Sequence, residues 1–367
     1  MKIRAAVVWE KSGPFAVEEL EMEEPRADEV RVRVVGVGVC HTDFSVRDQF
    51  YPVPLPAVLG HEASGVVEQV GRHVAKVEPG DHVVLTYLLC GTCRNCVQGK
   101  PAYCLYTFLY NFGGARLDQS TALPKGSDAI HSHFFGQSSC ATHVLASERN
   151  VVKVRKNVPL ELLGPLGCGI QTGAGAVLNS LRPAAGSSIV VFGTGSVGMS
   201  AVMAARVAGC TTIIGVDIQS NRLNAARELG ATHTINPEEI PDPVGEIQKI
   251  TGGGADYSLD TTVSPKVFRQ AVDCLIVTGI CGLIGGAALG TEVTFDMNTI
   301  LFGRTVRGII EGDSIPEIFI PRLIDLYTQG RFPFDRLIRK YQFEEINQAV
   351  QDSEQGQVFK PVLMMAG

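Results

Sequence analysis

The chain has 367 residues, of which 45% are hydrophobic and 19% are charged, and its formal net charge is −6. This length and composition favour a globular protein of two domains, and the acidic balance, without a basic tail or stripe, argues against nucleic acid and anionic membranes as partners. The first residues, MKIRAAVVWEKSG, lack the pattern of a signal peptide, so we expect a cytoplasmic protein.

Short alternating patterns predict a mostly-β domain over residues 1–163. The segment EVRVRVVGVGVC, which begins at Glu29, alternates charged residues with valine, as a half-buried strand does. The segments ASGVVEQVG and DHVVLTY predict further strands, joined by the turn VEPG. Residues 105–133 show no clear period and read as a long loop, and loops of this length tend to be functional.

Four cysteines of this domain crowd into a loop over residues 88–106, with the spacing C-x2-C-x2-C-x7-C. They could form two disulfides or close around one metal ion. In a reducing cytoplasm the metal is favoured, and four thiolates suit a closed tetrahedral zinc site that leaves no position open for chemistry. The predicted ligands of this structural zinc are Cys90, Cys93, Cys96 and Cys104.

Strand and helix patterns alternate over residues 164–310, beginning with SSIVVFG, SVGMSAVMAARVAG and TTIIGVD. This alternation predicts an α/β domain, a doubly wound parallel sheet of the Rossmann type with helices on both faces. The weakly charged stretch over residues 187–216 also admits a membrane span, but its glycines and β-rich ends favour a buried β-α-β unit. The remaining residues, 311–367, contain an amphipathic segment and a last strand, KPVLMM.

A glycine-rich turn, GTGSVG, lies between the first strand and first helix of this domain, and an aspartate ends the next strand. Gly193 would make the tight turn, Gly195 would admit the pyrophosphate and Gly198 would let helix meet strand. Asp217 would accept hydrogen bonds from the adenosine ribose and would repel a 2′-phosphate, which favours NAD over NADP. Arg222 is expected near the same ribose.

Three residues far apart in the sequence stand out: Cys40 in CHTD, His61 in GHE and Cys168 in GCG. A lone cysteine or histidine is usually a packing residue. Here the polar neighbours that follow Cys40 and His61, and the glycines beside His61 and Cys168, favour a second site.

The chain resembles the zinc-dependent medium-chain alcohol dehydrogenases over essentially its whole length, and within them it looks most like the aryl (benzyl) alcohol dehydrogenases. The resemblance implies a GroES-like catalytic domain, a Rossmann domain, and a return of residues 311–367 to the catalytic domain. The matching stretches are GVCHTD, GHEASGVVEQVG, the cysteine-rich loop, FFGQSSCATH, GCGIQTGAGA and GTGSVG.

The resemblance also implies that Cys40, His61 and Cys168 hold a catalytic zinc, so that each chain carries two zinc ions. The fourth position of this zinc would be open to water or an alcohol, whose hydride passes to NAD. Asp43 would orient His61, and Glu62 is a further candidate beside the metal.

The resemblance implies further roles in proton transfer and cofactor binding. Thr42 would accept the alcohol proton, but the histidine that ends the proton relay in the best-described relatives is replaced by Ser45. Water or His41 could serve instead, and His41 also aligns near the pyrophosphate. Lys360 is expected at the pyrophosphate, and Thr172 beside the nicotinamide.

We therefore expect an NAD-dependent enzyme that oxidises small primary, aromatic alcohols reversibly to aldehydes and that forms a dimer or tetramer. Alternatives are a polyol or secondary-alcohol dehydrogenase, a glutathione-dependent formaldehyde dehydrogenase, and, disfavoured by the complete ligand set, a zinc-free or non-catalytic relative. Tyr106, Phe108, Tyr110 and Phe112 alternate along the chain. They predict a packed strand or loop core, or a pocket wall above the zinc.

Overall fold

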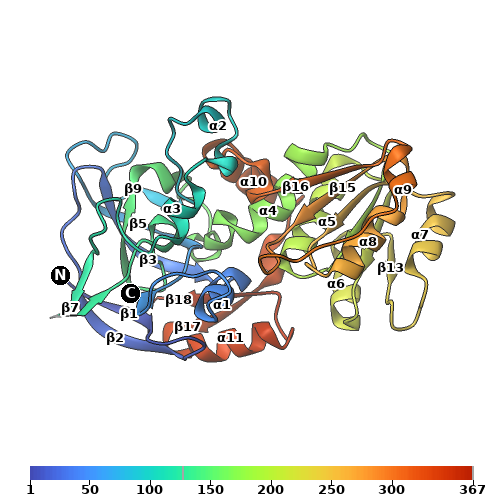
Figure 1. The fold of residues 1–367 in the computed structure, drawn as a ribbon. Coiled ribbons are helices and arrows are strands. Elements are labelled where there is room, and N and C mark those ends of the chain that lie inside the picture. The colour runs from blue at the N-terminus through green and yellow to red at the C-terminus, as the bar shows by residue number, and fades with distance from the viewer. Residues whose placement is uncertain (126–127, 366–367) are drawn as a thin grey trace. The chain divides into compact units, whose positions relative to one another are not determined.

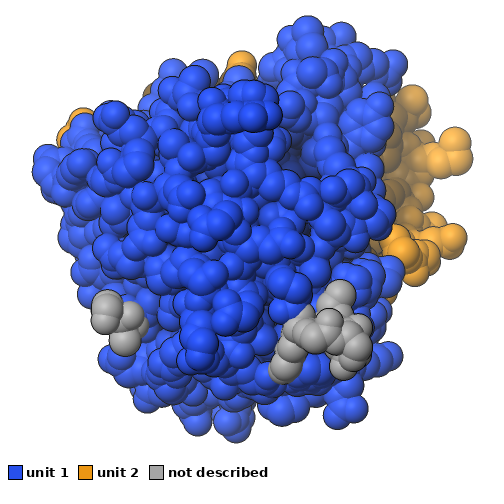
Figure 2. Space-filling model, turned by 90° about the vertical axis from the view of Figure 1, so that its left-hand side faces the viewer, with its two compact units in different colours: residues 1–168, 315–325, 335–367 blue, residues 169–314, 326–334 orange. Residues whose placement is uncertain are grey.

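The computed structural model describes residues 1–125 and 128–365 (Figure 1). The chain forms two compact units, which Figure 2 shows in different colours. Unit 1 contains residues 1–168, 315–325 and 335–367, and unit 2 contains residues 169–314 and 326–334. The expected boundaries at residues 163 and 310 lie a few residues before the crossings at 168 and 314. No pattern in the sequence indicates that residues 326–334 belong with unit 2.

Unit 1 is organised around a sheet of order β10-β6-β5-β3-β18-β17, in which β9 also pairs with β3. The valine alternation that predicted β3 is confirmed, because Val30, Val32 and Val34 are buried in the core of the unit. The sheet therefore joins strands from both ends of the chain. Its strands are β3 (Glu29–Gly38), β5 (Ala63–Val70), β6 (His82–Leu85), β9 (His143–Ser147), β10 (Val151–Val154), β17 (Ile338–Gln342) and β18 (Lys360–Met364).

A smaller sheet of order β2-β1-β4 and a β7-β8 hairpin complete the β-structure described in unit 1. These strands are β1 (Lys2–Val8), β2 (Phe15–Glu21), β4 (Ala57–Val58), β7 (Leu123–Lys125) and β8 (Asp128–Ile130). The helices of the unit are α1 (His41–Arg47), α2 (Arg94–Val97), α3 (Thr107–Phe112), α11 (Ile346–Glu354) and most of α10 (Pro316–Thr328).

The expectation of a packed strand or loop core at the alternating aromatic residues is wrong, because Phe108, Tyr110 and Phe112 lie on α3 and Tyr106 precedes its first residue. Asn111 fixes this turn: its side-chain amide donates to the carbonyl of Thr107 (2.9 Å) and exchanges hydrogen bonds with the backbone of Leu88. Side chains at alternate positions of a helix point in different directions, so these rings do not form one face. Phe108 is 69% exposed, whereas Phe112 packs inward against other rings.

Unit 2 is the predicted doubly wound sheet, with the order β13-β12-β11-β14-β15-β16 and parallel pairing throughout the described strands. The strand order reverses between β11 and β14, and a dinucleotide binds at such a reversal, beyond the carboxyl ends of the strands. The strands are β11 (Ser188–Phe192), β12 (Thr212–Val216), β13 (His233–Ile235), β14 (Ala255–Asp260), β15 (Leu275–Ile284) and β16 (Thr305–Ile309).

The helices of unit 2 flank this sheet in Figure 1. Residues 187–216 form β11, α5 and β12, so the β-α-β prediction is confirmed. Among the residues that the structure describes, no helix has the length and apolar character needed to span a bilayer. The helices are α4 (Gly169–Gly175), α5 (Ser196–Ala208), α6 (Ser220–Leu229), α7 (Pro243–Thr251), α8 (Pro265–Asp273) and α9 (Met297–Leu301).

Candidate active site and metal centres

Four predicted residues of unit 1 come together in one cluster, although they are far apart in the sequence. Cys40 caps the N-terminus of α1, His61 and Glu62 precede β5, and Cys168 follows a helical turn over residues 164–167. Their ligand atoms all lie within 4.8 Å of one another. We call Cys40, His61, Glu62 and Cys168 the catalytic cluster.

Asp43 orients the imidazole of His61. Its Oδ1 lies 2.9 Å from His61 Nδ1 and also accepts from the backbone N–H of Gly60, while its Oδ2 accepts from the backbone N–H of Cys40. Since Nδ1 then carries the proton, Nε2 is a lone-pair donor. His61 is fully buried, and its Nε2 has no hydrogen-bond partner among the described residues. A buried nitrogen without a partner is costly, and a metal ion would satisfy it.

The charges within the catalytic cluster also suit a metal ion. A hydrogen bond with Cys168 lowers the pKa of Cys40 well below its usual value, against the effect of burial and with the help of the charges of Lys360 and His61. Burial opposes the protonation of His61, but the charges of Asp43 and Cys40 outweigh it and raise the pKa of His61. A divalent cation would replace the proton of His61 and be neutralised by two thiolates. This donor set therefore fits zinc.

Glu62, the carboxylate of the cluster, is held by Lys360. The ammonium lies 3.0 Å from both carboxylate oxygens and 3.2 Å from the carbonyl oxygen of Val39, and both side chains are buried. Burial alone would lower the pKa of Lys360, but the negative charges of Glu62 and Cys40 raise it. The structure thus gives Lys360 a partner that the sequence did not suggest, and its expected contact with a pyrophosphate stays a prediction.

Aromatic rings lie against the imidazole of His61. Phe135 stacks on it, with 4.5 Å between ring centroids, and Phe134 meets it edge-on at 5.5 Å. Phe112 contacts both of these rings and Tyr51. We call Tyr51, Phe112, Phe134 and Phe135 the aromatic wall.

The backbone around the aromatic wall is strained and firmly anchored. Phe135 has a φ of 51°, in the left-handed region that non-glycine residues rarely occupy. The side-chain amide of Gln137 donates to the carbonyl oxygens of His61 (3.0 Å) and Thr86 (3.1 Å), and Asn150 donates to that of Phe135 (3.1 Å). FFGQSS belongs to a stretch that carries the family resemblance, but nothing in the sequence indicated a role for these residues.

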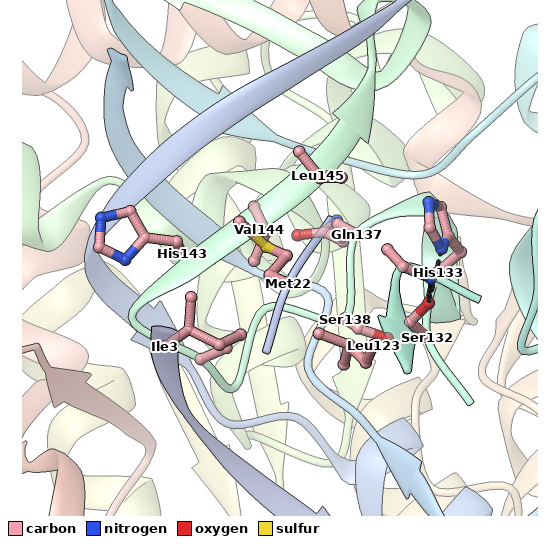
Figure 3. Close-up of a pocket in the computed structure, with 12 residues that line it drawn as sticks. Ile3, Met22, Leu123, Ser132, His133, Gln137, Ser138, His143, Val144 and Leu145 are labelled. Atoms are coloured by element: carbon pink, nitrogen blue, oxygen red, sulfur yellow. Dashed lines mark hydrogen bonds between the residues drawn. The ribbon is translucent and has the colours of Figure 1, made fainter. Parts of the chain in front are cut away.

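A buried polar network lies next to the segment FFGQSS. Figure 3 shows the hydrogen bond between Ser132 and His133, which is 2.8 Å long, beside a small pocket that Gln137 also lines. Arg116 binds both carboxylate oxygens of Glu29 (2.7 and 3.0 Å), which also faces His133. The pocket has room for about one water molecule, so it is too small for an organic substrate.

The cysteine-rich loop forms a second cluster in unit 1, whose sulfurs also lie within 4.8 Å of one another. The Sγ of Cys96 is 3.5 Å from that of Cys93 and 3.9 Å from that of Cys90. A disulfide needs about 2.05 Å, whereas sulfurs around a tetrahedral zinc with bonds of about 2.3 Å lie about 3.8 Å apart. The separations therefore match a metal site and not a disulfide.

Local electrostatics prepare part of this cysteine cluster for a cation. Burial opposes ionisation of Cys90, but the backbone N–H groups of Thr92 and Cys93 lower the pKa of its thiol to about 6. Burial raises the pKa of Cys96 to about 12. A bound zinc would remove the remaining protons, because coordinating thiols are deprotonated.

In unit 2, the glycines of GTGSVG lie where the sequence placed them, between β11 and α5. A Cβ at Gly198 would lie 1.9 Å from the carbonyl oxygen of Gly193, and Gly193 has a φ of 82°. A Cβ at Gly195 would meet nothing within 4 Å, which leaves the N-terminus of α5 open to a phosphate. This geometry fits a dinucleotide.

Asp217 follows β12 at the same edge of the sheet. Its Oδ2 accepts from the backbone N–H (2.8 Å) and hydroxyl (3.1 Å) of Thr194, and its Oδ1 accepts from the backbone N–H of Gln219. Arg222 lies 3.7 Å from Oδ2. Asp217 therefore ties the glycine-rich turn to the end of β12, and its contact with a ribose stays a prediction.

The other predicted residues divide between the units. In unit 1, the hydroxyl of Thr42 lies 3.8 Å from the sulfur of Cys40, and Ser45 follows one turn later on α1. His41, the first residue of α1, is exposed. Thr172 belongs to α4 of unit 2. The structure therefore gathers Thr42 with the catalytic cluster, and the roles of the other three stay predictions.

Comparisons with known proteins agree with this architecture. Residues 26–156 match the family profile of the alcohol dehydrogenase GroES-like domain, and residues 196–329 match that of zinc-binding dehydrogenases. A geraniol dehydrogenase from Castellaniella defragrans is 48% identical over 363 residues, which cover 98% of this chain and 97% of that protein.

Solved structures of similar proteins cover the whole chain. A benzyl alcohol dehydrogenase from Acinetobacter calcoaceticus is 50% identical, with a TM-score of 0.97 and full coverage of both chains. A zinc-binding-domain alcohol dehydrogenase from Burkholderia ambifaria is 56% identical, with a TM-score of 0.98 and the same coverage.

Proposed function

Because the chain belongs to the zinc-dependent medium-chain alcohol dehydrogenases, we propose that it oxidises primary, aromatic alcohols to aldehydes with NAD, using one catalytic and one structural zinc ion per chain. The observation that carries the proposal is the position of the aromatic wall against His61, beside two cysteine sulfurs. An apolar aromatic surface next to the metal ligands favours an alcohol with an aromatic or similarly unsaturated substituent.

The residues in and next to the catalytic cluster have different roles in the proposed reaction. Cys40, His61 and Cys168 would hold the catalytic metal, and Asp43 keeps the proton on Nδ1 of His61. When bound, zinc supplies a Lewis acid toward the alcohol oxygen and NAD supplies the hydride acceptor. Thr42, whose hydroxyl is close to Cys40, accepts the alcohol proton.

From Thr42 the proton passes along α1 to solvent. Ser45 takes the position of the usual relay histidine, one turn beyond Thr42, and its hydroxyl can hold a water there. His41, at the exposed start of α1, is the alternative proton acceptor.

The two relatives named for their substrates support the substrate class. Benzyl alcohol and geraniol both carry an unsaturated carbon next to the carbinol carbon, so each gives a conjugated aldehyde. We therefore extend the aromatic proposal to allylic primary alcohols as a second candidate class. A flat unsaturated group stacks well on the rings of the aromatic wall.

The choice of NAD over NADP rests on Asp217. Its carboxylate, fixed by Thr194 and Gln219 at the carboxyl end of β12, would repel a 2′-phosphate on the adenosine ribose. A cytoplasmic location and assembly into a dimer or tetramer stay predictions, and light scattering on the purified protein would measure the assembly.

A panel of alcohols with NAD tests the proposed substrate class. We expect kcat/KM for benzyl alcohol to exceed that for ethanol by at least about tenfold, which needs only ~1.4 kcal/mol of differential transition-state binding. Geraniol should resemble benzyl alcohol, and a preference for ethanol or a sugar alcohol would contradict the proposal.

Variants of the aromatic residues test the role of the wall. Phe135→Ala should lower kcat/KM for benzyl alcohol more than for ethanol, because the lost ring contacts only the larger substrate. Phe108→Ala is the matched control, since this ring is exposed on α3 and contacts the aromatic wall only through Phe112, and it should change both values far less than Phe135→Ala does. An equal loss for both alcohols in Phe135→Ala would show that the ring supports the metal site but does not select the substrate.

A further inference from the structure

One peptide unit of the glycine-rich turn, the one that joins Gly193 to Thr194, is held at both of its polar ends. Its N–H donates to Oδ2 of Asp217 (2.8 Å), and its carbonyl oxygen accepts from the hydroxyl of Thr261 (3.0 Å). Asp217 follows β12 and Thr261 follows β14, and these two strands flank β11. Side chains from both neighbouring strands therefore fix the orientation of this peptide.

Thr261 lies where the pairing of β11 with β14 ends. The last paired residues are Phe192 and Asp260. Beyond them, the backbone N–H and the hydroxyl of Thr261 both donate to the carbonyl oxygen of Phe192, at 3.0 Å each. The hydroxyl proton is thus shared between the carbonyl oxygens of Phe192 and Gly193. A Cβ at Gly193 would lie 2.5 Å from Oγ1 of Thr261, so this close approach requires glycine.

The turn that carries Thr261 is itself firmly held. Asp260 is fully buried, and its Oδ1 accepts from the backbone N–H (3.0 Å) and the hydroxyl (2.7 Å) of Thr262. Val263 has a φ of 54°, in the left-handed region where a β-branched residue is rarely found. Strained backbone of this kind persists where the surrounding structure imposes it, and it is frequent at binding sites. The contact of Thr261 with the glycine-rich turn gives this strain a purpose.

The orientation of the peptide between Gly193 and Thr194 matters for the binding of an anion. Gly195 follows directly, and open space around it leaves the N-terminus of α5 accessible to a phosphate. Backbone N–H groups bind a phosphate only when their peptides are oriented toward it. A peptide held at one end alone can rotate, and rotation exchanges the positions of its N–H and its carbonyl oxygen, which repels a phosphate.

We propose that Thr261 is a positioning residue for the pyrophosphate of the cofactor, because its hydroxyl and Asp217 together keep the glycine-rich turn in the conformation that binds this group. The inference rests on the proposed function, namely on NAD as the cofactor. Thr261 acts through the peptide of Gly193, so its effect should follow the pyrophosphate and not the adenosine.

Three substitutions separate the hydroxyl of Thr261 from its bulk. Thr261→Val removes the hydroxyl and keeps the branched shape, whereas Thr261→Ser keeps the hydroxyl. Thr261→Ala keeps the test decisive if the valine variant folds poorly, because it puts no methyl group against the carbonyl oxygens. Thr211→Val is the matched control. The hydroxyl of Thr211 also donates to a backbone carbonyl, that of Gly186 (2.8 Å), but it lies at the amino end of β12, away from the turn.

The test is to measure dissociation constants for NAD⁺, ADP-ribose and adenosine by calorimetry of the zinc-loaded protein. In Thr261→Val and Thr261→Ala we expect the constants for NAD⁺ and ADP-ribose, which both carry the pyrophosphate, to rise about fivefold, equivalent to ~1 kcal/mol. The constant for adenosine, which has no phosphate, should change less than about twofold, or ~0.4 kcal/mol. All three constants should stay within the same limit in Thr261→Ser and Thr211→Val.

Unchanged constants in both Thr261→Val and Thr261→Ala would overturn the proposal. Equal weakening of adenosine and NAD⁺, or a loss in Thr261→Ser as large as that in Thr261→Ala, would overturn it as well, because either result would show a general disturbance of unit 2. Wild-type protein that binds neither NAD⁺ nor ADP-ribose would instead overturn the cofactor of the proposed function, so the two failures are distinguishable.

Discussion

Replacing Asp43 by asparagine should weaken the catalytic metal site without unfolding unit 1. The carboxylate accepts three hydrogen bonds, from His61 Nδ1 and from the backbone N–H groups of Gly60 and Cys40. In Asp43→Asn the oxygen can still face His61, but the new amide then points its own N–H groups at the N–H of Cys40. One hydrogen bond is lost and the bond to His61 loses its charge.

The expected size follows from these contacts. A hydrogen bond to a charged group contributes about 1.5–3 kcal/mol and a neutral one about 0.5–1.5 kcal/mol, so the weaker bond to His61 alone costs about 1–1.5 kcal/mol of ligand preorganisation. Together with the bond lost at Cys40, this corresponds to a loss of zinc affinity of at least about tenfold, as expected of groups that orient metal ligands. Competition with a chelator, followed by metal analysis, measures this affinity.

A matched control lies on the same helix. Asp48 ends α1 and pairs with Arg47 at 2.8 Å, away from the cluster. Asp48→Asn should therefore leave zinc affinity unchanged. If Asp43→Asn retained wild-type affinity, the argument that its charge orients His61 would be refuted. If it lost thermal stability with its metal fully bound, Asp43 would have to be regarded as a folding residue instead.

Three further predictions concern stability, metal content and cofactor choice. Arg116→Met should destabilise unit 1 by about 3–5 kcal/mol, because it removes the guanidinium that binds both oxygens of the buried carboxylate of Glu29 and leaves that carboxylate facing His133. Burial opposes the ionisation of Glu29, but hydrogen bonds from its neighbours lower its pKa from 4.5 to about 2. The stabilisation is therefore complete above pH 4.5 and is lost as the pH falls toward 2. Urea unfolding should accordingly show a smaller effect of Arg116→Met in acid. The control is Arg26→Met, at an exposed ion pair, which should have little effect on stability at any pH. Cys104→Ser should remove one of two zinc ions and lower the thermal stability, and fully active wild type with a single zinc per chain would contradict the two-site arrangement. Asp217→Gly should raise the ratio of kcat/KM for NADP to that for NAD by removing the repulsion of the 2′-phosphate, and equal use of both cofactors by wild type would argue against this role.

Features written in local sequence were the most predictable. The alternating valines of β3, the turn between β11 and α5, and the cysteine-rich loop each depend on residues close together in the chain. The alternation of rings from Tyr106 to Phe112 led to a wrong prediction of the local structure. The two-residue period favoured a strand, but it left out Asn111, whose side chain closes a helical turn. The spacing of aromatic or apolar residues thus predicts a helix or strand only when the polar residues between them favour the same element.

Contacts across the fold were less predictable. Nothing near Lys360 in the sequence indicates that β18 lies beside β3 and carries its ammonium to Glu62. In the same way, the contacts of Phe135 and Gln137 with His61 join residues more than seventy positions apart.

The placement of β18 beside β3 also orders the events of biosynthesis. The proposed metal ligands of the catalytic cluster lie between residues 40 and 168, but the lysine that neutralises Glu62 is made 298 residues after it. Most of unit 2 is one continuous stretch, residues 169–314, which can fold as it emerges. The nascent chain therefore carries most of unit 2 while the sheet of unit 1 still lacks β17 and β18. A ribosome stalled before residue 360 would hold Glu62 without its counter-ion, and this interval is when the exposed thiols most need protection from oxidation or from the wrong metal.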